Sequence, residues 1–155
     1  MPTADRPLSV SPSVPPAIRN WVGFFDGALY RMLVPADLDR RYHRARCHGV
    51  GGRFARNLLD DLEITVNAPP AQMARIPSKG AAIVVANHPH GLAEGLALLA
   101  ALGSVRRDCR VVANSMLGGV APLRDDAILV NPFETAGAVA HNRSALRECL
   151  EWLRA

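Results

Sequence analysis

The sequence lacks several features that mark common classes of protein. Only 5% of its 155 residues are aromatic, and the net charge is modest, at 18 − 14 = +4. Nucleic-acid-binding surfaces usually combine a stronger basic charge with stacking aromatics, so no nucleic-acid partner is expected. The three cysteines, Cys47, Cys109 and Cys149, are widely spaced and form no C-x-x-C pair. This argues against a disulfide framework or a thiolate metal site and indicates a reducing, cytoplasmic compartment.

Long apolar runs are also absent. No stretch reaches the roughly 18 uninterrupted apolar residues that a membrane span requires. Residues Met1 to Pro16 are rich in Pro and Ser, contain no apolar signal core and are interpreted as a flexible leader. Ala17 to Leu33 has the apolar spacing of one helix face. The overlapping apolar stretch Trp21 to Val34 is predicted either to pack in the core or to lie on a bilayer surface.

What is present indicates a single packed domain that begins with helices. The hydrophobic content is 49%, which is typical of a globular protein with a core. Two further helices are predicted, at Ala36 to Cys47 and at Phe54 to Leu62, separated by His48-Gly49 and Gly51-Gly52. Residues 17–62 are therefore interpreted as an N-terminal helical segment.

From residue 63 the pattern changes to strands alternating with helices. Glu63 to Ala68 alternates polar and apolar residues and predicts a short strand, and Ala81 to Ala86 is an apolar run typical of a central, doubly buried strand. Two similar strands are predicted at Arg110 to Ala113 and Ala127 to Val130. Helices are predicted at Gly91 to Leu102 and at Ala138 to Arg154, the latter with Val139, Leu146, Leu150 and Leu153 as its apolar residues. This order predicts an α/β fold with at least three sheet strands over residues 63–155.

The segment that follows the predicted central strand carries candidate catalytic residues. Asn87-His88 lies where an open α/β sheet binds its ligands, at the carboxyl end of a strand. Glu94 falls in the first turn of the next helix, where the helix dipole favours a charged carboxylate. A hydrogen bond from one His88 ring nitrogen to Glu94 would fix the tautomer whose other nitrogen acts as general base. Backbone N–H groups at the helix start would stabilise an oxyanion.

Other interpretations of these residues stay open. A first-turn glutamate is often only a helix-end charge, and a loop histidine is often only a polar surface group; His90 is interpreted in that way, without a catalytic role. His88 and His90 could also share a zinc ion with Glu94 or His141, which would indicate a metal-dependent hydrolase. No second paired ligand motif follows along the chain, and we expect no metal.

The residues around His88 resemble a known motif. Val84 to Leu96 is similar to the first motif of the glycerolipid and lysophospholipid acyltransferases, particularly the hemolysin-like branch, which includes ornithine-lipid acyltransferases. Five residues separate His88 from Glu94, as in that branch, where most of the superfamily has four before an aspartate. The resemblance extends over roughly residues 54–155. It includes Ile76-Pro77 with Gly80, Arg110 to Leu117, Pro122 to Arg124, and Val130 to Phe133.

The resemblance implies a glycerol-phosphate-acyltransferase-like α/β domain with His88 as general base and Glu94 as its partner. The implied substrate-binding candidates are Asn87, Gly91, Asn114 and Arg124, and Arg143 is a second candidate for a phosphate contact. The acyl donor would be a thioester on coenzyme A or acyl carrier protein, the acceptor a lysophospholipid or related lysolipid, and no cofactor is expected. Such an enzyme works peripherally at the inner face of the membrane.

One block of the family pattern is missing. Family members carry a further motif with a Phe-Pro-x-Gly core, and this sequence reaches Ala155 without it. The resemblance therefore implies a domain that is incomplete at its C-terminus. A catalytically inactive module that binds lipid or a membrane surface is the alternative function.

Overall fold

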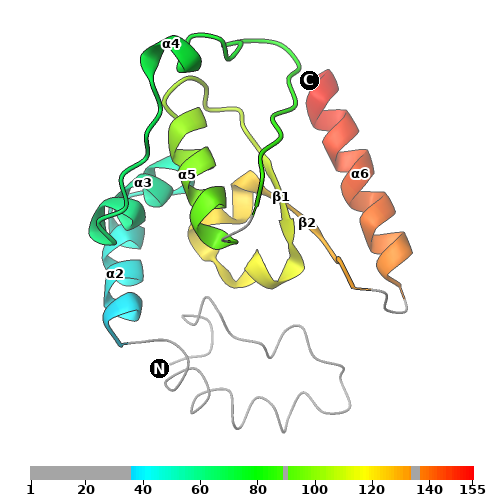
Figure 1. Ribbon diagram of the computed structural model, residues 1–155. Helices are drawn as coiled ribbons and strands as arrows, with labels where there is room; N and C mark the ends of the chain where they lie inside the picture. The colour runs from blue at the N-terminus through cyan, green and yellow to red at the C-terminus, as the bar shows by residue number, and fades with distance from the viewer. Residues whose placement is uncertain (1–35, 89–90, 134–136) are drawn as a thin grey trace, which may run out of the picture.

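The computed structural model describes residues 36–88, 91–133 and 137–155, and Figure 1 shows how they are arranged. The elements, in chain order, are α2 (Ala36–Cys47), α3 (Gly51–Asp61), α4 (Pro70–Met73), α5 (Leu92–Leu102), β1 (Val111–Asn114), the 3₁₀ helices η3 (Ser115–Gly119) and η4 (Ala121–Asp126), β2 (Ala127–Val130) and α6 (Ala138–Arg154). The protein is thus mostly helical, with a small α/β element. The predicted leader and the helix predicted over 17–33 lie outside the described residues.

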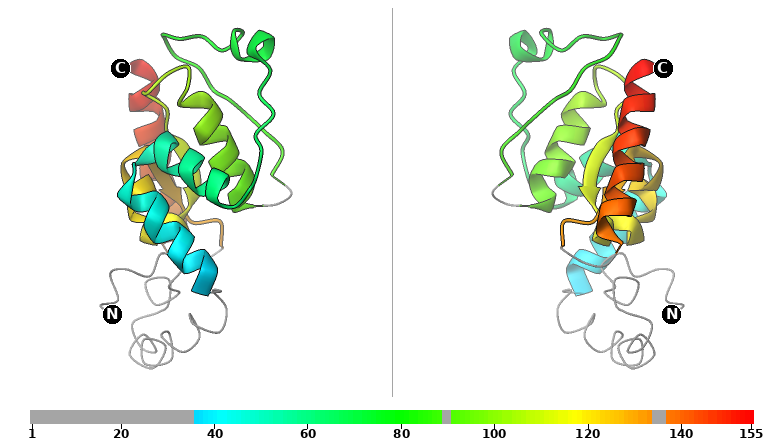
Figure 2. Two further views of the ribbon diagram at one scale, coloured as in Figure 1. Left: turned by 90° about the vertical axis from the view of Figure 1, so that its left-hand side faces the viewer. Right: turned by 90° about the vertical axis from the view of Figure 1, so that its right-hand side faces the viewer.

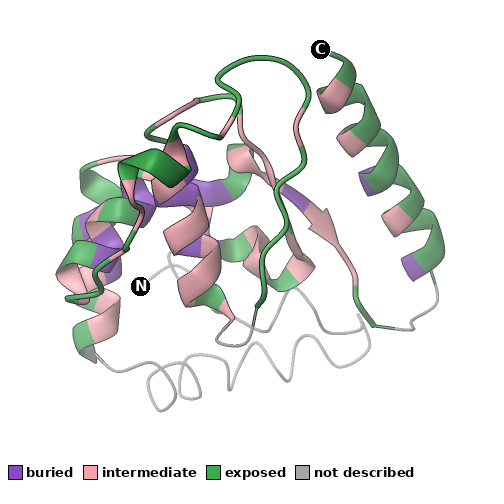
Figure 3. Cartoon of the chain, turned by 45° about the horizontal axis from the view of Figure 1, so that its top comes forward, coloured by how far each residue is buried: buried purple, intermediate pink, exposed green. Residues whose placement is uncertain are grey.

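The hydrophobic core lies where α2, α3 and α5 meet. Phe54 and Leu59 of α3 are each 1% exposed and pack against α5, while Tyr42 of α2 meets Phe54 edge to face, with ring centroids 5.6 Å apart. The two glycines Gly52 and Gly103 let α3 and α5 approach closely, because a Cβ at Gly52 would lie 2.9 Å from the Leu99 carbonyl oxygen. Figure 3 shows the buried residues concentrated in these helices.

The sheet is small and parallel. β1 pairs with β2 in a register that runs from Val111 opposite Ala127 to Asn114 opposite Val130. Helix α6 is tied to the end of β2 by a reciprocal pair of hydrogen bonds. The Asn131 N–H donates to the Asn142 side-chain oxygen, and the Asn142 amide donates to the Asn131 carbonyl, each at 2.8 Å.

Several predicted elements are confirmed. The helices at 36–47 and 138–154 and the strand at 127–130 have the predicted bounds, and the predicted helices at 54–62 and 91–102 and the strand at 110–113 differ by a few residues from those observed. The strand predicted over Glu63 to Ala68 is wrong. That stretch is irregular, Glu63 has a φ of +60°, and Ile64 is 39% exposed. Alternating apolar residues favour a strand only where a neighbouring strand is available to pair with them.

The predicted central strand at Ala81 to Ala86 is also wrong. Ile83 is 76% exposed and Val85 is 87% exposed, and within the described residues no backbone–backbone hydrogen bond involves residues 81–88. In Figure 1 this segment descends as a green coil between α5 and α6, and Figure 2 shows it standing apart from the two strands. An apolar, β-branched run lacks the ladder hydrogen bonds that define a strand unless a partner edge meets it. Where at least three strands were predicted, the described part of the chain forms a sheet of two.

Helix α6 keeps most of its apolar residues at the surface. Val139 is 75% exposed, Leu146 63% and Leu150 52%, whereas the buried positions are Ala138 and Ala145. The fully buried positions of α6 are therefore small residues, whereas these three larger ones are exposed. Among the described helices, none combines the length and apolar character needed to cross a bilayer.

Candidate active site

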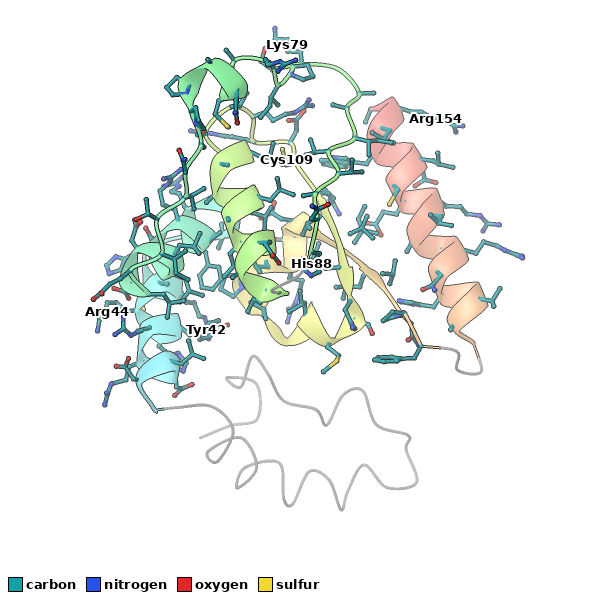
Figure 4. All side chains as sticks on the ribbon, in the orientation of Figure 1. Tyr42, Arg44, Lys79, His88, Cys109 and Arg154 are labelled. Atoms are coloured by element: carbon teal, nitrogen blue, oxygen red, sulfur yellow. The ribbon has the colours of Figure 1, made fainter. Side chains whose placement is uncertain are left out.

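The structure brings the two predicted catalytic side chains together. His88 Nδ1 lies 3.3 Å from Glu94 Oε2. His88 is on the irregular segment that follows residue 80, rather than directly at the end of a strand as predicted, and Glu94 is on α5. Figure 4 shows His88 beside the lower end of α5, at the end of the molecule toward which β1 runs. The contact leaves Nε2 as the ring nitrogen that faces away from the carboxylate.

Glu94 is held by a well-anchored helix. It lies in the first turn of α5, whose residues Leu96 and Leu99 are buried in the core. The N-cap residue of α5 is Gly91, which has no side chain to cap the helix and has a φ of +71°, in the region that favours glycine. The first N–H groups of a helix have no partner within it, so they are suited to an anionic oxygen. The start of α5 is therefore rigid, and its N–H groups give this part of the site a partial positive charge.

His88 is the accessible member of the pair. Its side chain is 66% exposed, compared with 26% for Glu94. The carboxylate is thus about three-quarters covered, and the histidine is mostly open. This difference suits a pair in which Glu94 orients the ring and His88 contacts the substrate. The same geometry would make the contact a weak surface ion pair if no substrate bound there.

Of the other predicted site residues, Asn114, Arg124 and Arg143 make no hydrogen bond or ion pair with the pair within the described residues. Asn87 is exposed and lies next to His88 in the chain. The Asn114 side chain caps η3 by accepting a hydrogen bond from the Met116 N–H at 3.0 Å, which gives it a structural task. Arg124 and Arg143 are exposed on η4 and α6. Their roles in substrate binding stay predictions.

The comparisons with known proteins assign no family. No protein-family model matches the chain, and no curated protein or solved structure is significantly similar to it. The resemblance to acyltransferase motifs therefore stays a prediction from the residues quoted above. Any chemistry for this site has to be argued from its own geometry.

Metal binding finds no support in the described geometry. Of the four candidate zinc ligands, His90 lies outside the described residues, and His141 is exposed on α6. Within the described ranges, no three His, Cys, Asp or Glu side chains form a group that could hold a metal ion. All three cysteines are free thiols. The zinc site interpreted from His88 and His90 stays a prediction, because His90 lies outside the described residues.

One open cavity of about 430 Å³ lies away from the pair. Its lining is formed by the end of α3, the stretch that follows it, and Ala100 near the far end of α5. None of the predicted site residues lines it. The Arg56 guanidinium at its rim donates a 3.0 Å hydrogen bond to the Ala100 carbonyl, which ties α3 to α5.

Sequence reasoning missed a polar cluster in the loop after α5. Residues 104–108 lie in the connection between α5 and β1. In the structure Arg106 and Asp108 form a doubly hydrogen-bonded pair, with Nε to Oδ1 and Nη2 to Oδ2 both at 2.7 Å. Two charges two positions apart in a loop carry no sequence signal that distinguishes such a pair from ordinary solvated residues.

Proposed function

We propose that the protein is an acyltransferase that moves a fatty acyl group from a thioester to a lysophospholipid or related lysolipid, with His88 as general base. The observation that carries the proposal is the 3.3 Å contact between His88 Nδ1 and Glu94 Oε2. A carboxylate at Nδ1 favours the tautomer with its proton on that nitrogen and leaves Nε2 as the acceptor. The backbone N–H groups at the start of α5, where the N-cap is a glycine, are the oxyanion donors that the reaction requires.

The reaction follows from these groups. His88 Nε2 removes the proton of the acceptor hydroxyl as its oxygen attacks the thioester carbonyl carbon, and a C–O bond forms. The carbonyl becomes an oxyanion, which N–H groups at the start of α5 stabilise. The C–S bond then breaks, and the imidazolium returns its proton to the departing thiolate. Glu94 stabilises the imidazolium between the two proton transfers. The cycle needs no resident cofactor.

Acyl transfer can be tested directly with the protein, a long-chain acyl-coenzyme A and a lysophospholipid, by measuring thiol release and the acylated product together. His88→Ala should lower the rate by roughly 10²–10⁴, the usual contribution of a general base. His141→Ala, which removes an exposed histidine of α6, is the matched control and should leave the rate unchanged. Near-wild-type transfer by His88→Ala would exclude the assigned role.

A second candidate function is favoured by the exposed face of α6. Val139, Leu146 and Leu150 are exposed, and they share one helix face with Arg143 and Arg154, at intervals of three or four residues. Apolar side chains flanked by arginines are the pattern of a helix that lies in the headgroup region of an anionic bilayer. The alternative is therefore a non-catalytic module that binds the inner face of a membrane through α6.

Vesicle binding, measured together with acyl transfer, separates the two candidates. The protein should sediment with phosphatidylglycerol-containing vesicles, less strongly at high salt, and Leu146→Glu should weaken the binding. Ser144→Glu adds the same charge on an exposed position away from that face and is the control. Equal binding by the two variants would contradict a role for this face. Vesicle binding without any acyl transfer by the wild-type chain would favour the module over the enzyme.

A further inference from the structure

Arg106 joins two segments that are far apart in the sequence. Its Nη1 donates to the carbonyl oxygens of Pro77 at 3.1 Å and Gly80 at 3.0 Å. Its other donors bind both carboxylate oxygens of Asp108, and the Arg106 side chain is only 12% exposed. A planar guanidinium can make these four hydrogen bonds at once, whereas a lysine ammonium has neither the fork nor the donors.

The same arginine is fixed to the end of α5. The Arg106 N–H donates to the Leu102 carbonyl at 3.0 Å, so the residue continues the last turn of the helix. Glu94 lies in the first turn of this helix. The segment that carries His88 is consequently held to α5 at two places, by Arg106 at its beginning and by Glu94 at its end. Figure 4 shows the two ends far apart, with Lys79 near the top and His88 near the bottom.

Between these two points the segment has no regular secondary structure. Within the described residues no backbone–backbone hydrogen bond involves residues 81–88. The position of His88 therefore depends on where the segment begins.

We propose that Arg106 is a positioning residue, which clamps residues 77–80 to the end of α5 and so keeps His88 within reach of Glu94. The clamp is reinforced from α6, where Trp152 Nε1 donates to the Asp108 carbonyl at 2.9 Å. The hydrogen bonds to Arg106 also hold the pKa of Asp108 below its ordinary value, which keeps the partner carboxylate charged. The effect on catalysis rests on the proposed acyl transfer, whereas the clamp itself does not.

The only lysine of the chain gives a direct probe of the clamp. Lys79 lies between the two clamped carbonyls, so a lysine-specific protease has one cleavage site, at the Lys79–Gly80 bond. Arg106→Gln should accelerate this cleavage about fivefold to tenfold, the factor expected when one or two net hydrogen bonds are lost. The control is Arg107→Gln, an exposed neighbour with no polar contact in the described part of the chain, and it should leave the cleavage rate unchanged.

The second readout is the tautomer of His88, followed through the ¹⁵N shifts of its ring and assigned by the signal lost in His88→Gln. In the wild type the proton should be on Nδ1, facing Glu94. Arg106→Gln should increase the fraction with the proton on Nε2, whereas a merely structural defect elsewhere would not change the tautomer. Asp108→Asn loosens the same clamp more gently, and it decides the question by the same two readouts if Arg106→Gln fails to fold.

The outcomes are distinct. Unchanged cleavage and an unchanged tautomer in the folded variant would overturn the clamp. If Arg106→Gln shows both faster cleavage and a changed tautomer, but the wild type transfers no acyl groups, the clamp is supported and the proposed function is excluded. If the wild type transfers acyl groups, Arg106→Gln should lower kcat more than it raises KM, because the acceptor site is intact and only the base is misplaced.

Discussion

The helical half of the molecule and the half built around the sheet bury their apolar residues to different extents. In the first, formed by α2, α3 and α5, Phe54, Ala55 and Leu59 are each at most 1% exposed. In the second, Val112 of β1 is 57% exposed and Leu146 of α6 is 63% exposed. Burial of apolar area is the main source of stability, so the helical half carries most of it.

The candidate site lies across the boundary between these halves. Glu94 belongs to α5 and is held by the core, whereas His88 belongs to a segment that is nearly free of backbone hydrogen bonds. An active site that joins a rigid orienting group to a less constrained base requires some other contact to position the base. Arg106 is the residue that meets this requirement.

The largest expected loss of stability comes from a substitution that creates a cavity in the helical half. Phe54→Ala removes a ring that is 1% exposed and should lower the free energy of unfolding by about 3–5 kcal/mol. Phe133→Ala makes the same chemical change at a residue that is 57% exposed and should change it by less than about 0.5 kcal/mol. Urea denaturation of the two variants measures both values. Similar losses at the two positions would mean that the second half is as well packed as the first.

A smaller effect is expected where α3 meets α5. Gly52→Ala places a methyl group 2.9 Å from the Leu99 carbonyl oxygen and should destabilise the protein by about 1–3 kcal/mol. Gly95→Ala, also in a helix, meets nothing within 4 Å and should stabilise α5 by about 0.5–1 kcal/mol. Thermal melts of the pair give opposite shifts in Tm. A shift of the same sign for both would show that the close helix contact is not real.

The smallest effect concerns the pH dependence of the clamp. The hydrogen bonds from Arg106 lower the folded-state pKa of Asp108 from its ordinary value near 3.8. The stabilising contribution of this carboxylate is therefore fully present above that value and is lost as the pH falls through the lower folded-state pKa. Denaturation curves between pH 2 and 5 should show a weaker loss of stability for Asp108→Asn than for the wild type. Asp60→Asn, at an exposed carboxylate on α3, should follow the wild-type curve.

Local sequence patterns predicted the helices well and the sheet poorly. The helix at Ala36–Cys47 and that at Ala138–Arg154 carry their own periodicity and end signals, so their bounds follow from nearby residues. A strand depends on a partner strand that the local sequence does not contain. For this reason the prediction of a central strand at 81–86 is wrong.

The candidate pair was predictable because its two members are close in sequence. His88 and Glu94 are six positions apart, and Glu94 lies in the first turn of α5. The Arg106 contacts were not predictable, since Pro77 and Gly80 are 29 and 26 positions away and are bound through backbone oxygens. Backbone acceptors have no residue-specific signature.

Amide hydrogen exchange tests the contrast between the two segments of the candidate pair most directly. It compares α5, which carries Glu94, with the irregular segment that carries His88 in one experiment. The account predicts that amides of Leu96 to Leu102 in α5 exchange roughly 100-fold or more slowly than those of Ala82 to His88. Protection of residues 82–86 equal to that of α5 would contradict it. That result would mean that this segment is a paired strand, as its sequence alone predicted.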